Sequence, residues 1–416
     1  MLEKIKNKTY GWLRWSEKYT KTDMVYLAQG GFWLNLGQLI SSFSAFLLAL
    51  AFANLISPET FGEYKYILSI AGMLSVFNLT GIGTALTKSV SQGYDGSLQP
   101  ALKTKIKWGF LGGLICLGVG LYYYFIQNNP QIFWSLAITA IFLPLMDSFS
   151  LFSSYLAGKK EFKISAQYSI VSQIIYVALM ALTLFLTKNV LIILSAYFLL
   201  NSLIRFACYQ ITLKKFKPNN EVDPETIKYG KHLSAINVLS TIAQYFDQII
   251  VFHFLGSAQL AIYAYATAFP EHIRNFLKFI QTIALPKLAE KNKEESLRSV
   301  YQKTSQIAIF ILIATLAYII TAPLLFKYLL PQYLASLHYS QVFALSLIYF
   351  VIALPISYLQ AQAEHKKLYQ FYTATSLFQI IILLPLIYFY GLWGVIVSRI
   401  IARYFQIFFL FYIIKK

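Results

Sequence analysis

The sequence predicts an all-α membrane protein whose chain crosses the bilayer many times. Its 416 residues are 57% hydrophobic and only 12% charged, with a mean hydropathy of +0.57, which is more apolar surface than a soluble domain can bury. The apolar residues form twelve stretches, and each is near the roughly 20 residues that a membrane-spanning helix requires. These stretches are residues 28–53, 64–84, 106–126, 131–157, 165–187, 189–212, 232–255, 259–285, 304–326, 341–362, 368–390 and 391–414.

The basic residues predict the orientation of the chain. With the N-terminus inside, 28 of the 35 Lys and Arg residues lie in the N-terminal segment, the even-numbered loops and the C-terminus, while three lie in the odd-numbered loops and four within helices. Cytoplasmic loops of membrane proteins are enriched in these residues. We therefore expect both termini in the cytoplasm and a bacterial-type inner membrane as the location. The net charge of +18 reflects this topology, and nucleic acid is not an expected partner.

Residues 1–27 precede the first stretch and have a different character. They are charged and contain Tyr10, Trp12, Trp15 and Tyr19, at spacings that suit a helix lying in the inner membrane interface. They show no pattern of a cleavable signal peptide. We expect the first stretch to act as its own insertion signal.

An internal repeat divides the twelve stretches into two halves. Residues 55–66 connect the first and second stretches, and residues 254–265 connect the seventh and eighth 199 positions later. Each half then holds six helices, an even number, so the two halves have the same orientation and form parallel repeats. The predicted domains are an N-terminal bundle at 28–213, a cytoplasmic linker at 214–231 and a C-terminal bundle at 232–416.

The eighth stretch carries three charged residues on one narrow arc, because Glu271, Arg274 and Lys278 are spaced i, i+3 and i+7. A charge at a helix centre costs about 2.5–3.5 kcal/mol on insertion scales, so it usually faces a cavity or a partner. One interpretation is that Arg274 and Lys278 hold an anion. The alternative is a stripe that neutralises itself, with Lys278 reaching the membrane surface.

Arg399 and Arg403 form a second cationic pair, one turn apart on the last stretch. They either line a cavity or pair with an acidic side chain such as Asp147.

Polar side chains follow one face of the seventh stretch, and such a face is costly toward lipid. We expect it to line a lumen, together with polar residues of the first stretch; the alternative is hydrogen bonding between helices. Among the acidic residues, Asp247 is the first candidate for coupling to H+ or Na+, followed by Glu271 and Asp147. The predicted polar lumen consists of Asn35, Gln38, Asn237, Ser240, Gln244 and Gln248.

The motifs and long loops that the sequence lacks exclude several classes of function. The sequence has no phosphate-binding loop for ATP, and its two cysteines, Cys116 and Cys208, lie in apolar stretches as small hydrophobic residues. We expect no metal site and no cofactor. The longest outer loop, about residues 327–340, is too short for a catalytic domain. A transporter is therefore predicted rather than an enzyme.

Four segments carry a resemblance to a known family: L-I-S-P-E-T-F-G-E-Y at 55–64, G-I-G-T-A-L at 81–86, F-L-G-S-A-Q-L-A-I-Y-A-Y at 254–265 and G-L-W-G at 391–394. They resemble the Wzx-type polysaccharide and O-antigen flippases of the multidrug/oligosaccharidyl-lipid/polysaccharide (MOP) exporter superfamily. The resemblance implies a V-shaped pair of six-helix bundles that alternates between inward-open and outward-open states.

The resemblance also implies the cargo, an oligosaccharide on a polyprenyl diphosphate that moves from the cytoplasmic to the outer leaflet. Arg274, Lys278, Arg399 and Arg403 would then bind the diphosphate. Lys65 would guide it outward; the alternative is a lysine that reaches the membrane surface and pairs with Glu63. Outward movement of negative charge gains about 2.3 kcal/mol per charge per 100 mV, and an ion gradient is the other expected energy source. Further expected partners are membrane lipids, a glycan polymerase and glycosyltransferases.

Two other functions are alternatives to a flippase. A cation-coupled drug or small-molecule antiporter of the same superfamily would have an anionic lumen, whereas the stretches hold four cations against three acids. A membrane-embedded oligosaccharide polymerase or ligase would need a large outer loop for its active site.

Overall fold

The computed structural model describes residues 24–277, 293–362 and 364–415. Within these residues every regular element is a helix, which confirms the all-α class. The elements of the first part are α2 (Met24–Leu55), α3 (Pro58–Leu74), η1 (Ser75–Asn78), α4 (Gly81–Ser91), η2 (Asp95–Ser97), α5 (Leu98–Phe125), α6 (Pro130–Ser148), α7 (Leu151–Gly158), α8 (Phe162–Leu186) and α9 (Val190–Phe216). Those of the second part are α10 (Thr226–Leu255), α11 (Ser257–Leu277), α13 (Lys293–Leu329), η3 (Pro331–Ser336), α14 (Leu337–Ala344), η4 (Leu345–Ile352), α15 (Ala353–Ala361) and α16 (His365–Lys415).

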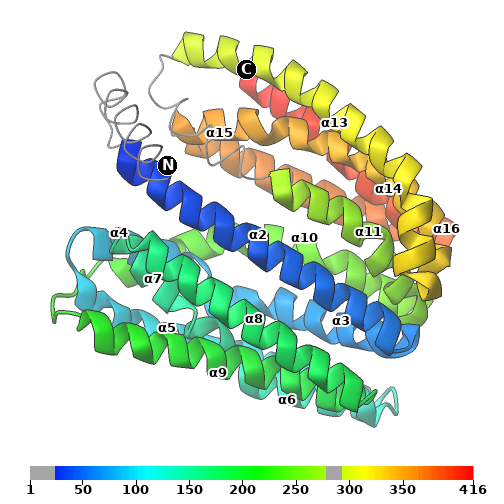
Figure 1. Ribbon diagram of the computed structural model, residues 1–416, viewed down its shortest axis with the longest axis horizontal. Coiled ribbons are helices and arrows are strands. Elements are labelled where there is room, and N and C mark those ends of the chain that lie inside the picture. Colours follow the sequence, from blue (N-terminus) through cyan, green and yellow to red (C-terminus); the bar gives the residue numbers. More distant parts are fainter. Residues whose placement is uncertain (1–23, 278–292, 363, 416) are drawn as a thin grey trace, which may run out of the picture.

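The helices form two groups arranged as a V (Figure 1). One group contains α2 to α9 and the other contains α13 to α16, with α10 and α11 between them. The groups diverge toward the end of the molecule where α2 begins and α16 ends. Residues 217–225 connect α9 to α10 at this end, which we call the linker end. The opposite end, which holds the short turns at residues 56–57, 126–129 and 187–189, is called the turn end.

Side-chain N-caps explain where α3 and α6 begin at the turn end. Ser57 precedes α3, and its hydroxyl accepts a hydrogen bond from the backbone N–H of Thr60 at 3.3 Å. The side chain of Asn129 caps α6 in the same way, through the N–H of Ile132 at 3.1 Å. Both helices then start with proline, whose missing N–H costs nothing in the first turn.

The predicted count of twelve membrane-spanning helices is not confirmed. Nine helices in the described ranges are long and apolar enough to cross a membrane, or ten if α3 and α4, which bend by 46°, form one span. Two differences from the sequence prediction explain the lower number. Helix α16 contains both of the last predicted stretches, and α11 is described only as far as Leu277.

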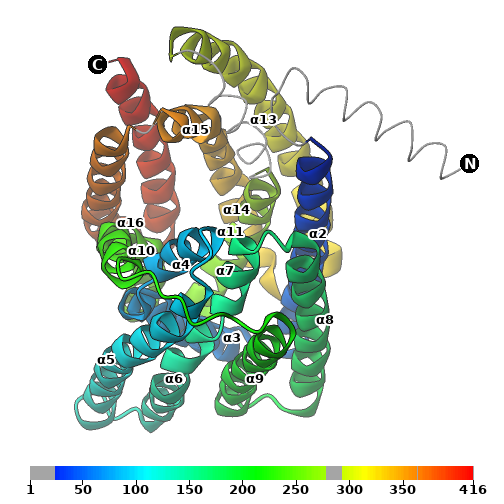
Figure 2. The same ribbon diagram turned by 90° about the vertical axis from the view of Figure 1, so that its left-hand side faces the viewer.

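A sharp break at Gly391 divides α16 into two parts. Gly391 has φ 54° and ψ −134°, a conformation that glycine adopts readily. A Cβ atom on Gly394 would lie 1.8 Å from the Leu386 carbonyl oxygen, so the chain turns back on itself here. Figure 2 shows the two parts as separate segments, orange before the break and red after it. The predicted stretches 368–390 and 391–414 therefore form a helical hairpin.

Small residues bring the two predicted halves into close contact. At the turn end, a Cβ atom on Gly62 of α3 would lie 1.9 Å from the backbone oxygen of Ser257, where α11 begins. Farther toward the linker end, the N–H of Gly81 in α4 donates to the hydroxyl of Ser234 in α10 at 3.0 Å. Small residues permit such close helix contacts in membranes. The exact domain boundaries of the halves stay a prediction.

Candidate functional site

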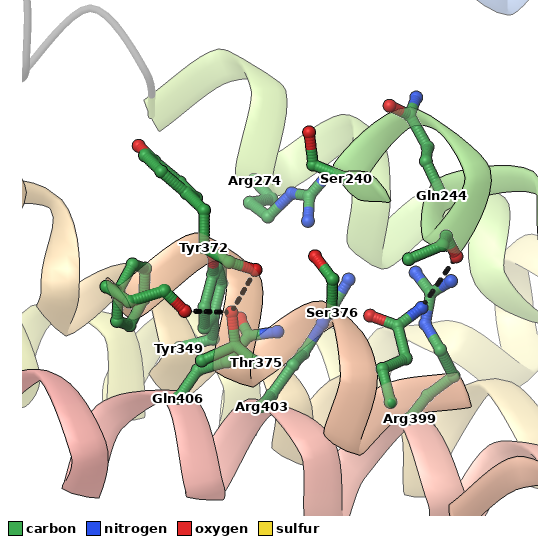
Figure 3. Close-up of a pocket in the computed structure, with 13 residues that line it drawn as sticks. Ser240, Gln244, Arg274, Tyr349, Tyr372, Thr375, Ser376, Arg399, Arg403 and Gln406 are labelled. Carbon is green, nitrogen blue, oxygen red and sulfur yellow. Dashed lines mark hydrogen bonds between the residues drawn. The ribbon is translucent and has the colours of Figure 1, made fainter. Parts of the chain in front are cut away.

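A cavity of about 260 Å³ lies among α10, α11, η4 and both parts of α16. Its wall combines three arginines with hydroxyl, amide and aromatic side chains. Figure 3 shows Arg274 entering from α11 on one side, with Arg399 and Arg403 entering from the second part of α16 on the other. The lining residues are Ser240, Ala243, Gln244, Arg274, Tyr349, Phe371, Tyr372, Thr375, Ser376, Gln379, Arg399, Arg403 and Gln406.

One carboxylate, that of Glu271, contacts all three arginines. Its Oε2 lies 2.6 Å from a guanidinium nitrogen of Arg274, and its Oε1 lies 3.3 Å from Arg399. The same Oε1 also accepts a hydrogen bond from Arg403. Glu271 is not among the residues that line the cavity, so it acts as a counter-ion behind the arginines that do.

Asp247 of α10 is a more enclosed counter-ion. Its Oδ2 lies 2.5 Å from Arg399 and accepts a hydrogen bond from the Tyr263 hydroxyl. The backbone N–H of Gln248 donates to its other oxygen at 2.9 Å. The side chain of Asp247 is 2% exposed, against 21% for Glu271. Both oxygens of Asp247 thus have hydrogen-bond partners, whereas the buried Oε2 atom of Glu271 has none among the described residues.

The three arginines differ in how firmly they are held. Arg403 donates to the Ser346 hydroxyl at 2.5 Å and lies over the rings of Phe343 and Tyr349, at 4.8 and 5.6 Å. Such cation–π contacts stabilise a desolvated guanidinium. Arg274 is less constrained, because its buried Nε has no hydrogen-bond partner among the described residues. This nitrogen remains available as a donor.

The site carries a surplus of positive charge. Within the described residues, Arg274, Arg399 and Arg403 face only Asp247 and Glu271, which leaves one unit of positive charge. Arg399 is eight residues beyond the break at Gly391, which corresponds to about 12 Å of helix. A cationic cavity at this depth can bind an anionic group, and guanidinium groups bind phosphate oxygens two at a time.

The sequence suggested the wrong acidic partner for Arg399 and Arg403. Asp147 lies on α6 and forms an ion pair with Lys105 of α5 at 2.8 Å. Asp247 and Glu271 take the place that Asp147 was expected to fill, because the side chains that reach Arg399 and Arg403 come from α10 and α11.

Two basic residues that were counted with the cytoplasmic charges make contacts between helices. Lys105 lies in α5, just before the predicted stretch 106–126, and Arg205 lies in α9, within the predicted stretch 189–212. Lys105 is buried in its ion pair, and the guanidinium of Arg205 donates to the Met146 carbonyl at 3.0 Å. For Arg205, its position within a predicted apolar stretch was the signal that the count overlooked.

The predicted polar lumen is only partly assembled around the cavity. Ser240 and Gln244 line it. Gln248 instead accepts a hydrogen bond from Ser69 of α3 at 2.9 Å, and Gln38 donates to Ser42 within α2 at 3.3 Å. Asn237 is exposed.

The three remaining residues that were predicted for the site are Lys65, Asn35 and Lys278. Lys65 is on α3, with its ammonium group 5.6 Å from the Phe61 ring, and does not line the cavity. The side chains of Asn35 and Lys278 lie outside the described residues.

The sequence analysis did not predict the residues that line the cavity from the part of α16 preceding Gly391. Thr375, Ser376 and Gln379 line the cavity, and the Gln379 amide donates to the Ala243 carbonyl of α10 at 2.9 Å. Their spacing of i, i+1 and i+4 within an otherwise apolar stretch could have indicated this face. No group of His, Cys, Asp and Glu in the described ranges is arranged to hold a metal ion.

Comparison with solved structures shows a shared fold. The chain is similar to the lipid II flippase MurJ in an inward closed conformation, with 16% identity and a TM-score of 0.72 over 94% of this chain and 88% of that one. It is also similar to a multidrug resistance MATE family transporter of the MOP superfamily. The inward-facing form gives a TM-score of 0.65 at 10% identity, covering 92% of this chain and 94% of that one. The outward-facing form gives 0.61 at 12% identity, covering 93% and 96%.

Comparison with models of protein families shows to which family the chain belongs. No curated protein matches the chain. Residues 27–292 match the polysaccharide biosynthesis protein family, a range that includes α2 to α11 but ends before the helices that complete the cavity. The chain therefore belongs to the polysaccharide biosynthesis protein family and has the V-shaped fold of MOP superfamily transporters.

Proposed function

We propose that the protein is a flippase that moves an oligosaccharide linked to a polyprenyl diphosphate from the cytoplasmic to the outer leaflet. The observation that carries this proposal is the cavity whose wall contains Arg274, Arg399 and Arg403, with one unit of surplus positive charge. A diphosphate supplies the negative charge and the paired oxygens that such a site binds. Membership of a polysaccharide biosynthesis family supports the glycan.

The cavity volume suggests which part of the cargo it holds. Its 260 Å³ is below the range of about 300–1,000 Å³ typical of pockets for whole drug-sized ligands. The diphosphate and the nearest sugar would occupy it, beside the amides of Gln244, Gln379 and Gln406. The rest of the glycan would lie between the arms of the V, and the polyprenyl chain would stay in the membrane.

The direction of transport follows from charge. In this proposal the linker end, where the V is open, faces the cytoplasm, in agreement with the Lys and Arg bias of the loops. The membrane potential then drives the anionic cargo outward. A coupling ion, H+ or Na+, would bind at Asp247 or Glu271 and would have to compete with the arginines already there.

The same proposal assigns the expected partners. Glycosyltransferases would build the lipid-linked glycan at the cytoplasmic face, and a polymerase would use it at the outer face. The chain itself would act as a transporter, not an enzyme.

The decisive experiment is complementation of a bacterial strain that lacks its own oligosaccharide flippase, scored by surface glycan at matched membrane levels. Wild type should restore glycan and Arg274→Ala should not. Lys228→Ala is the matched control, because Lys228 is also cationic but lies at the surface with its side chain 82% exposed. Wild type that fails in several such strains yet lowers drug sensitivity would replace this proposal with a drug antiporter.

A further inference from the structure

Glu271 and Asp247 are two acidic residues of the same site that differ in how they are bonded. Asp247 has three hydrogen-bonding or ion-pair partners, and neither it nor Glu271 is among the residues that line the cavity. The Oε2 atom of Glu271 is buried, and it makes an ion pair with Arg274 at 2.6 Å without a hydrogen bond of good geometry. An anion entering the cavity would therefore compete with Glu271 more readily than with Asp247.

The arginines that Glu271 contacts are those that the cavity offers to a ligand. Arg399 is already neutralised by Asp247, so Arg274 and Arg403 supply the remaining positive charge. Glu271 bonds to both of them. While it does so, the pair presents one unit of net positive charge instead of two, and a diphosphate with two negative charges is bound less strongly than the two arginines alone would allow.

We propose that Glu271 is an internal competitor that limits how tightly the site binds its anionic cargo and thereby permits release. This inference rests on the proposed function. A site that bound the diphosphate equally tightly in every conformation would retain it, because uniform binding does not accelerate turnover. A carboxylate attached to the same guanidinium groups offers them an alternative partner when the cargo leaves, so the arginines are not left unpaired.

The test is titration of the purified full chain in detergent with inorganic pyrophosphate, by calorimetry. Glu271→Gln keeps the shape of the side chain and removes its charge, and it should lower the Kd for pyrophosphate at least about tenfold. Glu225→Gln is the matched control, because it makes the same chemical change at a surface residue whose side chain is 68% exposed, and it should leave the Kd within about threefold of wild type. Glu271→Asp, which keeps the charge, should also stay near the wild-type Kd.

The same variants separate binding from turnover. Glu271→Gln should restore less surface glycan than wild type despite its tighter binding, because release becomes slow. A variant that was merely misfolded would lose both properties. In wild type, labelling of Glu271 by a hydrophobic carbodiimide should increase when pyrophosphate is present, while labelling of Asp247 stays constant; this measurement requires no substitution.

The outcomes distinguish the two proposals. If wild type binds pyrophosphate, Arg274→Ala does not, and Glu271→Gln binds no tighter than wild type, the competitor role is wrong while the proposed function stands. Unchanged carbodiimide labelling overturns it in the same way. If neither wild type nor Glu271→Gln binds pyrophosphate, both the competitor role and the diphosphate site are wrong.

Discussion

Arg399 contacts Asp247 at 2.5 Å, and this ion pair joins the second part of α16 to the middle of α10. The two residues are 152 positions apart; Asp247 is buried and Arg399 is partly buried. Because a buried charge without a partner is costly, the pair fixes which face of each helix the other can meet. The cavity therefore owes part of its shape to this ion pair.

Removing one member of this pair should destabilise the protein. Arg399→Ala leaves Asp247 buried without its cation, and breaking a buried ion pair in this way costs about 3–5 kcal/mol. We expect a clear fall in the midpoint of thermal unfolding of the purified protein. The double variant Arg399→Leu with Asp247→Asn removes both charges and should recover much of the loss. A single variant as stable as wild type would contradict the structural role of the pair.

Close contact at the turn end gives a second prediction. Any side chain at Gly62 meets the backbone oxygen of Ser257, and backbone yields less easily than a flexible side chain. Gly62→Ala should separate α3 from α11, lower stability by about 1–3 kcal/mol and reduce glycan restoration. Gly118→Ala is the matched control, because no atom lies within 4 Å of a Cβ placed there. Equal thermal stability of the two variants would show that the contact is not tight.

The sequence could predict the fold class and part of the site, for reasons visible in particular residues. Helical spacing shows that Glu271 and Arg274 share a face, and the structure pairs them. The same spacing contains no information on which helix lies opposite. Asp147 and Asp247 were therefore both acceptable partners for Arg399, and only packing distinguishes them. The hairpin at Gly391 was expected, but the polar face just before it was hidden in an apolar stretch.

A third prediction concerns the linker between α9 and α10. Asp223 accepts a hydrogen bond from the Ser89 hydroxyl at 2.6 Å, and its N–H donates to the Ser97 hydroxyl at 2.9 Å. Asp223→Ala should loosen the linker from the end of α4, and faster proteolysis between α9 and α10 would report this. Glu221→Ala is the control, since that side chain is exposed nearby. Equal cleavage rates for the two variants would rule out this attachment.

The linker contact should also be insensitive to mild changes of pH. The Ser89 hydroxyl, followed by the Glu225 N–H, holds the pKa of Asp223 below its ordinary value. A lowered pKa in the folded state means that the stabilisation is complete above the ordinary pKa and is lost only as the pH falls through the lowered value. The wild-type proteolysis rate, corrected for protease activity, should thus be constant between about pH 5 and 8. A rate that rises across this range would show that another titrating group controls the linker.

The last prediction concerns the ion pair within the N-terminal half. Lys105 is buried beside Asp147 at 2.8 Å, and the surplus charge of the cavity lies elsewhere, so we expect this pair to support structure and not cargo binding. Lys105→Met should lower thermal stability by leaving Asp147 unpaired, and adding Asp147→Leu should restore it, since an apolar pair of similar volume is often neutral or stabilising. The double variant should bind pyrophosphate with the wild-type Kd and restore surface glycan. If it is stable yet loses pyrophosphate binding, the anion site extends into the N-terminal half, and the three arginines of the cavity are not sufficient for it.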